Sequence, residues 1–125
     1  MNYLVVDLEM CKVAKHYRTK KYKYANEIIQ IGAVLLDENY EQIGTLSQYV
    51  HPEHGVIDHF ISDLTGIQKS NVKNAPLLTE VLIHMINWLG DREYKVIAWS
   101  DTDRNQLLHE IVSKEISDER IDDFM

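Results

Sequence analysis

The sequence predicts a single α/β domain that has a mixed sheet with helices packed against it. Three strand-like segments come first, at residues 2–8, 27–37 and 41–50, and polar or turn residues separate them, which predicts an antiparallel meander. A helical pattern, a short apolar segment at 95–99 and a second helical pattern follow. This order favours a sheet that adds at least one parallel strand to the meander and carries helices on its flanks.

The early segments differ in their patterns. Residues 2–8 are short and rich in Leu and Val, and we expect a buried strand. Residues 27–37 are apolar on both faces, as in a central strand, and Gly32 among them favours a close neighbouring backbone. Residues 37–40, Asp-Glu-Asn-Tyr, have turn chemistry and lead into the third segment, which completes the meander.

Helical patterns dominate the second half of the chain. Residues 53–75 should be irregular with short helical turns. Asn74, with Pro76 just after it, predicts the start of a helix that Gly90 ends. The apolar positions of this helix follow the i, i+3, i+4 pattern: Leu78, Val81, Leu82, Met85, Ile86 and Leu89.

Composition is ordinary for a soluble globular protein. Apolar residues make up 45% of the chain and charged residues 26%, and no apolar run approaches the roughly 18 residues of a membrane span. The N-terminus lacks the basic-then-apolar layout of a signal peptide, and the one cysteine, Cys11, cannot form an internal disulfide. We therefore expect a cytoplasmic protein without a membrane partner.

A basic, aromatic segment lies in the long polar connection at residues 12–26. The net charge of −7 argues against nucleic-acid binding by the whole surface. Six of the thirteen basic residues nevertheless fall here: Lys12, Lys15, Arg18, Lys20, Lys21 and Lys23. Tyr17, Tyr22 and Tyr24 are interleaved with them, which suits a phosphate backbone with unstacked bases. Lys20 and Lys21 are candidate substrate contacts, and a solvated, lysine-rich hairpin loop is the alternative.

Asp7 and Glu9 end the first apolar segment. Side chains at i and i+2 of a strand point to the same face, so these carboxylates should lie side by side. Like charges repel, and burial strengthens the repulsion, so such a pair persists most easily around a cation. Oxygen ligands of this kind suit Mg²⁺ or Mn²⁺. The alternative is a solvated strand end that continues into a charged loop.

A second acidic cluster, Ser-Asp-Thr-Asp at residues 100–103, follows the strand expected at 95–99 and precedes a helix expected over about 103–114. Helix capping alone explains it, because Ser and Asp are favoured N-cap residues. If the strand lies parallel to the first strand, both end at one edge of the sheet, where open α/β sheets place ligands. Asp101 or Asp103 would then face the first acidic pair.

Four segments resemble landmarks of the DEDD 3′–5′ exonucleases, which have a ribonuclease-H-like fold and are related to polymerase proofreading subunits. The segments are Asp7-Leu8-Glu9, Glu27-Ile-Ile-Gln-Ile-Gly-Ala-Val, Leu64-Thr65-Gly66-Ile67 and Trp99-Ser-Asp-Thr-Asp103-Arg-Asn-Gln-Leu. The Leu-Thr-Gly-Ile block and the Trp-x-Asp-x-Asp spacing are closest to the branch that trims small and structured RNAs. The resemblance covers essentially the whole chain in the right order, and it implies one exonuclease-like domain over residues 1–125.

The resemblance implies a metal-dependent enzyme that hydrolyses phosphodiester bonds at the 3′ ends of single-stranded RNA or DNA. Asp7, Glu9 and Asp103 would be its catalytic residues and would hold two Mg²⁺ or Mn²⁺ ions for two-metal hydrolysis. Asp7 would bridge both ions and Glu9 would bind one of them. Four further residues would bind the substrate at its 3′ end: Met10, Leu64, Thr65 and Trp99.

The third motif of the family has no match. This motif is a histidine followed about five residues later by an aspartate, several dozen residues beyond Asp103, whereas only 22 residues remain between Asp103 and Met125. We therefore expect a C-terminally truncated fold without the family's last strand and helix, and little or no turnover by this chain alone. Either it is the front of a longer exonuclease or it is a shortened natural variant.

Two other functions remain open. One is a catalytically inactive module that keeps the exonuclease fold and binds nucleic acid or a partner. The other is a globular domain whose acidic residues only cap helices and line turns. No residue distinguishes RNA from DNA as the substrate, because no contact to a 2′-hydroxyl can be assigned.

Overall fold

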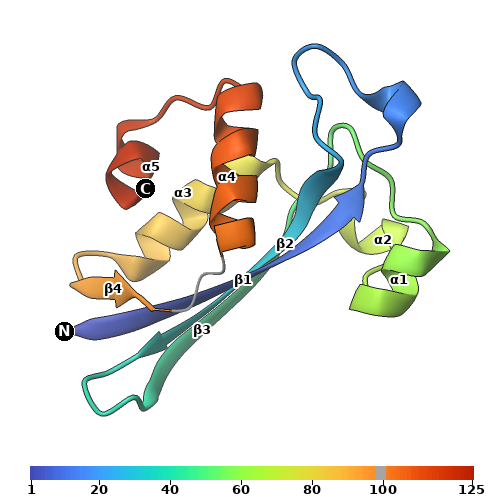
Figure 1. Cartoon of the computed structure of the whole chain (residues 1–125). Helices are drawn as coiled ribbons and strands as arrows, with labels where there is room; N and C mark the ends of the chain where they lie inside the picture. The colour runs from blue at the N-terminus through green and yellow to red at the C-terminus, as the bar shows by residue number, and fades with distance from the viewer. Residues whose placement is uncertain (98–100) are drawn as a thin grey trace.

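The computed structural model describes residues 1–97 and 101–125, and its centre is a four-stranded mixed sheet (Figure 1). The strands are β1 Asn2–Lys12, β2 Asn26–Leu36, β3 Gln42–Tyr49 and β4 Tyr94–Val96. They lie in the order β3-β2-β1-β4, antiparallel through the first three. β4 pairs in parallel with the start of β1. The predicted meander with an added parallel strand is confirmed.

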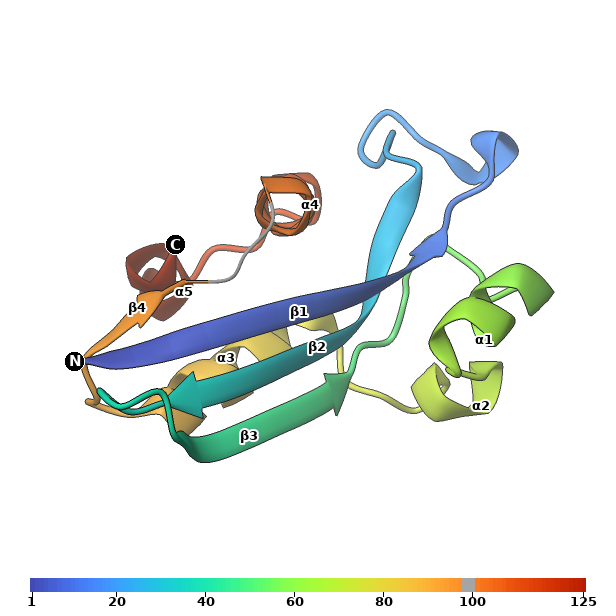
Figure 2. The same cartoon turned by 60° about the horizontal axis from the view of Figure 1, so that its bottom comes forward.

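Short and medium helices flank this sheet. They are α1 His59–Thr65, α2 Lys69–Val72, α3 Leu78–Leu89, α4 Asp101–Ser113 and α5 Glu119–Phe124, with a 3₁₀ turn at Lys15–Tyr17. α1 and α2 lie near the far end of β1, whereas α4 and α5 lie on the side of β4 (Figure 2). No helix within residues 1–97 and 101–125 is long and apolar enough to cross a membrane.

β1 is longer than predicted and is deeply buried on one face only. It continues to Lys12, and Leu4, Val6 and Leu8 are buried while Asp7 between them is exposed. The expectation that the whole segment is buried is therefore wrong. The main core covers the face that carries the leucines and valine, so the alternate residues, Asp7 among them, lie on the other face.

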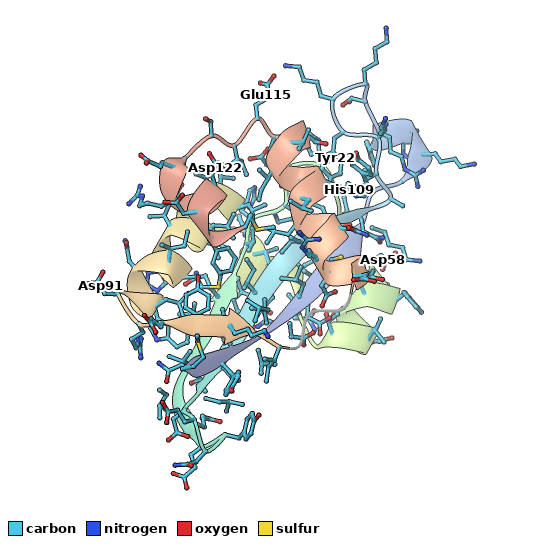
Figure 3. The ribbon with its side chains drawn as sticks, turned by 60° about the vertical axis from the view of Figure 1, so that its left-hand side comes forward. Tyr22, Asp58, Asp91, His109, Glu115 and Asp122 are labelled. Atoms are coloured by element: carbon cyan, nitrogen blue, oxygen red, sulfur yellow. The ribbon has the colours of Figure 1, made fainter. Side chains whose placement is uncertain are left out.

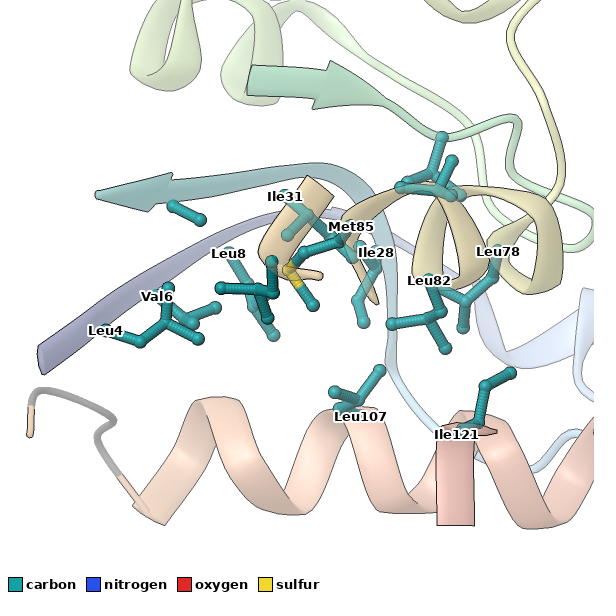
Figure 4. Packing of buried hydrophobic residues seen from close by; sticks show 14 of the residues in the cluster. Leu4, Val6, Leu8, Ile28, Ile31, Leu78, Leu82, Met85, Leu107 and Ile121 are labelled. Carbon is teal, nitrogen blue, oxygen red and sulfur yellow. The ribbon is translucent and has the colours of Figure 1, made fainter. Parts of the chain in front are cut away.

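Two hydrophobic clusters stabilise the fold. The larger joins the sheet to α3, α4 and α5 (Figure 4), and its buried helical residues are Leu78, Val81, Leu82, Met85, Leu89, Leu107 and Ile121. The smaller combines residues of α1, α2, strands and loops: Cys11, Ile29, Ile57, Ile61, Ile67 and Val72. The β1–β2 register shifts after Glu9 and leaves Ile29 without a partner in the ladder, so that Ile28 and Ile31, three residues apart, both belong to the larger cluster.

α3 begins later than predicted. Its first residue is Leu78, so the expected start at Asn74 is wrong. The preceding segment is held elsewhere, because the Pro76 carbonyl accepts a hydrogen bond from the His51 N–H at 2.8 Å. Gly90 ends the helix as predicted, with a φ of 61° that few other residues adopt.

The last two helices also differ from the prediction. α4 begins at Asp101, slightly earlier than expected, and ends at Ser113. α5 was not predicted, because a six-residue helix shows too little periodicity to be recognised. Its Ile121 is fully buried in the larger cluster, and α5 packs against α3. α5 therefore covers part of the apolar surface of the larger cluster.

Gly55, in the loop before α1, has no room for a side chain. A Cβ at this position would lie 2.5 Å from Cys11 Sγ and 3.0 Å from the Lys12 carbonyl oxygen. The loop cannot move away easily, because the Gly55 N–H donates to the buried Glu27 carboxylate at 2.7 Å. We expect Gly55→Ala to lower the free energy of unfolding by about 1–3 kcal/mol, measured by urea denaturation.

Gly32→Ala is the matched control for this prediction. Its Cβ would meet the Asp7 carbonyl oxygen at 3.7 Å, which is an ordinary contact, so the close backbone approach expected there is absent. Equal destabilisation by the two substitutions would contradict the steric explanation.

Candidate metal and nucleic-acid site

Asp7 and Glu9 occupy alternate positions of β1 and share one face of the strand, as their spacing predicts. In the ladder with β2, Asp7 lies opposite Gly32 and Glu9 lies opposite Gln30. Asp7 is exposed and Glu9 is half-buried. Neither residue across the ladder carries a charge, so β2 does not neutralise this pair.

Asp103 of α4 acts on Glu9. It lies in the first turn of that helix and is half-buried. Burial raises the pKa of Glu9, and the negative charges of Asp7 and Asp103 raise it further. Such an effect requires proximity, so Glu9 lies within electrostatic reach of both Asp7 and the distant Asp103. Asp101, in the same turn of α4, is exposed.

These carboxylates suit a divalent cation in their chemistry. All three offer oxygen ligands, which Mg²⁺ and Mn²⁺ prefer, and a cation would remove the repulsion that raises the pKa of Glu9. Over residues 1–97 and 101–125, however, no three Asp, Glu, His or Cys side chains are already gathered as a metal-binding group. The three acids therefore fit the ion in type and charge, but their side chains are not yet arranged around one point.

The predicted substrate contacts lie in different settings. Leu64, on α1, is 70% exposed. The Thr65 hydroxyl is engaged within its own loop, because it donates to the Ile61 carbonyl at 2.8 Å and accepts from the Ile67 N–H at 3.1 Å. Met10 is half-buried and packs against the larger cluster.

Met10 and Trp99 are two of the contacts expected around the 3′ end. Met10 is adjacent to Glu9 in β1 and faces the core, so the acids and Met10 lie on opposite faces of the strand. Trp99 lies outside the described residues. The roles of Met10, Leu64, Thr65 and Trp99 remain predictions.

The basic loop, residues 12–26, buries one of its tyrosines and exposes another. Lys20 and Lys21 are exposed, and Tyr17 is 55% exposed. Tyr22, in contrast, is fully buried, so the expectation that it offers a free ring to a base is wrong. Tyr24 stacks on His109 of α4, with the ring centroids 4.2 Å apart. Figure 3 shows Tyr22 beside α4, on the side that carries His109.

A buried polar network explains the position of Tyr22. The Tyr22 hydroxyl donates to the Asn26 carbonyl at 2.5 Å. Gln106 Nε2, on α4, donates to the same carbonyl at 2.9 Å and to Glu110 Oε2 at 2.8 Å. Glu110 Oε2 also accepts from the Ile28 N–H at 2.9 Å. The network therefore joins the basic loop, the start of β2 and α4.

Lys114 connects this network to a second buried carboxylate. Its Nζ lies 2.9 Å from Glu110 Oε1 and 2.7 Å from Glu27 Oε2. Glu27 also accepts three backbone N–H groups, from Glu53, His54 and Gly55. Because α4 carries Asp103 in its first turn, the network also fixes the helix that brings Asp103 toward β1.

The two buried glutamates respond differently to their surroundings. Burial favours the neutral form of Glu27, but the Lys114 ammonium and the backbone donors outweigh it and lower the pKa. For Glu110, burial outweighs the effect of Lys114 and Gln106, and the pKa is raised. Burial lowers the pKa of Lys114, but Glu110 and Glu27 together hold it above its usual value.

This network was not predicted from the sequence, in which Glu27 is the first residue of an apolar segment. One signal was available, because Gln106 and Glu110 of α4 and Lys114 directly after it are spaced by four and can share one face of a helical turn. That spacing shows which side chains can meet, but not that Glu27 lies against them.

A family model described as an exonuclease, RNase_T, matches residues 4–115. The chain belongs to this family. It is therefore a DEDD-type exonuclease domain, and exonucleases of this type generally use divalent metal ions. The recognition of the family from four short segments is confirmed.

Two curated proteins are similar to parts of this domain. The PolC-type DNA polymerase III of Caldanaerobacter subterraneus is 47% identical over 57 residues, which are 46% of this chain and 4% of that protein. The 3′-5′ exoribonuclease 1 of Rattus norvegicus is 34% identical over 73 residues, 57% of this chain and 21% of that protein. The chain thus spans about a fifth or less of these relatives.

The fold is also found in a solved 3′-exonuclease structure that concerns 3′-end recognition of a histone mRNA stem-loop. The TM-score is 0.73 at 23% identity, and the match covers 88% of this chain and 40% of that one. At this identity the similarity shows the fold alone. The ribonuclease-H-like mixed sheet with flanking helices is confirmed.

Proposed function

We propose that this chain is a domain of a metal-dependent exonuclease that removes nucleotides from the 3′ ends of single-stranded nucleic acid. One observation carries the proposal: in a member of the exonuclease family, Glu9 of β1 lies close enough to Asp7 and to Asp103 of α4 for their charges to raise its pKa. Such mutual repulsion among carboxylates is what a cation relieves.

In this proposal Asp7, Glu9 and Asp103 hold two Mg²⁺ or Mn²⁺ ions. The ions would supply charge stabilisation and an activated water for in-line attack at phosphorus. The half-burial of Glu9 excludes part of the solvent on one side, while the exposed Asp7 remains accessible to a phosphodiester. Exposed Leu64 would offer an apolar contact to the terminal nucleotide.

The substrate is RNA or DNA. Of the similar proteins, one is named as a DNA polymerase and three as exoribonucleases. The polymerase match has the higher identity over a shorter segment, so the relatives favour neither substrate. Lys20 and Lys21, exposed in the basic loop, are the proposed contacts to the backbone.

A catalytically inactive binding module is the second candidate. It is favoured by one observation: none of the six histidines is followed five residues later by aspartate, so the family's third motif has no counterpart in this sequence. Loss of a general base alone removes about 10²–10⁴-fold of rate. Binding of a 3′ end without cleavage would fit this candidate.

The cleavage assay uses a 5′-labelled single-stranded oligonucleotide, excess protein, long incubation and Mn²⁺. We expect slow shortening from the 3′ end that stops with EDTA and falls by at least about 100-fold in Asp7→Asn, because the loss of a charged group that stabilises the transition state has an effect of this size. Shortening that Asp7→Asn leaves unchanged would contradict the assignment, and binding without any shortening would favour the second candidate.

A further inference from the structure

A cavity of about 510 Å³ lies at the root of the basic loop, directly beyond the end of β1. Its lining includes Lys12, Tyr17, Arg18, Asn26, Val56 and Asp58. We propose that this cavity binds an unstacked nucleotide upstream of the 3′-terminal one, in a single strand whose 3′ end lies at Asp7 and Glu9. The inference rests on the proposed function and specifies how the strand continues from the candidate metal site.

The charges of the lining suit a phosphate. Lys12 and Arg18 contribute two cations. Arg18 Nε donates to the Val13 carbonyl at 3.0 Å, which orients the guanidinium and leaves both Nη groups outside that bond. Asp58 is the acid of the lining, and its Oδ1 is engaged by the Ile61 N–H at 2.9 Å as the N-cap of α1. An arginine held in this way offers a directed pair of donors to a phosphate.

The same cavity offers a surface for a base. Tyr17 is 55% exposed, and its ring lies against His16 with the centroids 4.2 Å apart. Val56, 47% exposed, adds an apolar group to the lining. A base can stack on a tyrosine ring whatever its identity, so this site would bind a nucleotide without reading its sequence.

The cavity is formed before any ligand arrives. The Val13 N–H donates to the Ala25 carbonyl at 2.8 Å, which closes the base of the loop. Inside the loop, the Thr19 N–H donates to the Tyr22 carbonyl at 2.9 Å, and the Tyr22 side chain is buried in the polar network. A loop that is already ordered adds little entropic cost when it binds.

Exposed side chains of α1 and β1 connect the predicted position of the terminal nucleotide to the cavity. Glu9 and Lys12 are three residues apart on β1, which is about 10 Å in a strand. Phe60 and Leu64 are both exposed and lie one turn apart on α1, about 6 Å along the helix. Lys12 Nζ lies over the Phe60 ring, 5.1 Å from its centroid. Leu64, at the predicted terminal nucleotide, is therefore followed by Phe60 and then by Lys12, which lines the cavity.

The test compares the binding of a dinucleotide and an octanucleotide, each 5′-labelled, by fluorescence anisotropy in Ca²⁺. We expect Tyr17→Ala and Arg18→Gln to weaken octanucleotide binding by about tenfold or more, the effect of losing one stacked base or one phosphate contact. The dinucleotide, too short to reach the cavity, should bind as before. Tyr17→Phe keeps a ring and should keep octanucleotide affinity. Lys95→Gln removes an exposed charge on β4 and is the control.

Two results would overturn the inference: variants that weaken both lengths equally, or a wild-type protein that binds both lengths with the same affinity. Thermal denaturation of each variant checks that folding is retained. Failure here is separable from failure of the proposed function. Metal-dependent shortening without length-dependent binding would contradict only the nucleotide site in the cavity. Length-dependent binding without metal-dependent shortening would contradict only the proposed catalysis.

Discussion

Replacing Lys114 by methionine is expected to lower the free energy of unfolding by about 3–5 kcal/mol, the cost of leaving buried charges without their partner. Only 6% of the Lys114 side chain is exposed, and its ammonium contacts Glu27 and Glu110 at 2.7 and 2.9 Å. Methionine has a similar length, so the substitution removes the charge while it retains most of the packing. A domain of ordinary stability would lose a large part of its margin.

Urea denaturation followed by circular dichroism measures this loss. Lys95→Met is the matched control, because Lys95 is exposed on β4, and it should change the free energy of unfolding by no more than about 0.5 kcal/mol. Glu110→Gln combined with Lys114→Met should recover part of the lost free energy of unfolding, because Glu110→Gln neutralises one of the two carboxylates left without a partner. A loss in Lys114→Met no larger than that of the control would contradict the assigned role of the network.

The parts of the fold that follow local periodicity could be predicted from the sequence. The apolar run at residues 27–37 predicted β2, the turn residues after it predicted β3, and the i, i+3, i+4 pattern predicted α3. Asp7 and Glu9 were paired correctly, because a spacing of two is sufficient to put both on one face of a strand. The parallel β4 followed from the order of the elements.

Features that depend on contacts between distant segments could not be predicted. Nothing near Glu27 shows that Lys114, far along the chain, neutralises it. Tyr22 looked like the other tyrosines of the basic loop, and its burial depends on Gln106 and Asn26. The start of α3 was displaced for the same reason, since a hydrogen bond to His51 holds the segment that contains Pro76.

Asp103→Asn is expected to weaken metal binding far more than Asp101→Asn. Both aspartates lie in the first turn of α4 and both could cap a helix, but Asp103 is half-buried and, after burial and Asp7, contributes to the raised pKa of Glu9. If Asp103 holds the metal, Asp103→Asn removes a ligand, whereas Asp101→Asn removes an equal charge from an exposed position of the same turn. Substituting a residue that only orients a metal ligand lowers metal affinity by about 10–100-fold, so the loss of a ligand itself should lower it by at least about 100-fold.

Calorimetric titration with Mn²⁺ is the most direct measurement of the shared cation site. The wild-type chain should bind Mn²⁺, Asp101→Asn should bind it with nearly the same affinity, and Asp103→Asn and Asp7→Asn should each lose at least about 100-fold. Equal affinities for the Asp101 and Asp103 variants, or no Mn²⁺ binding by the wild-type chain, would contradict a metal site built from Asp7, Glu9 and Asp103.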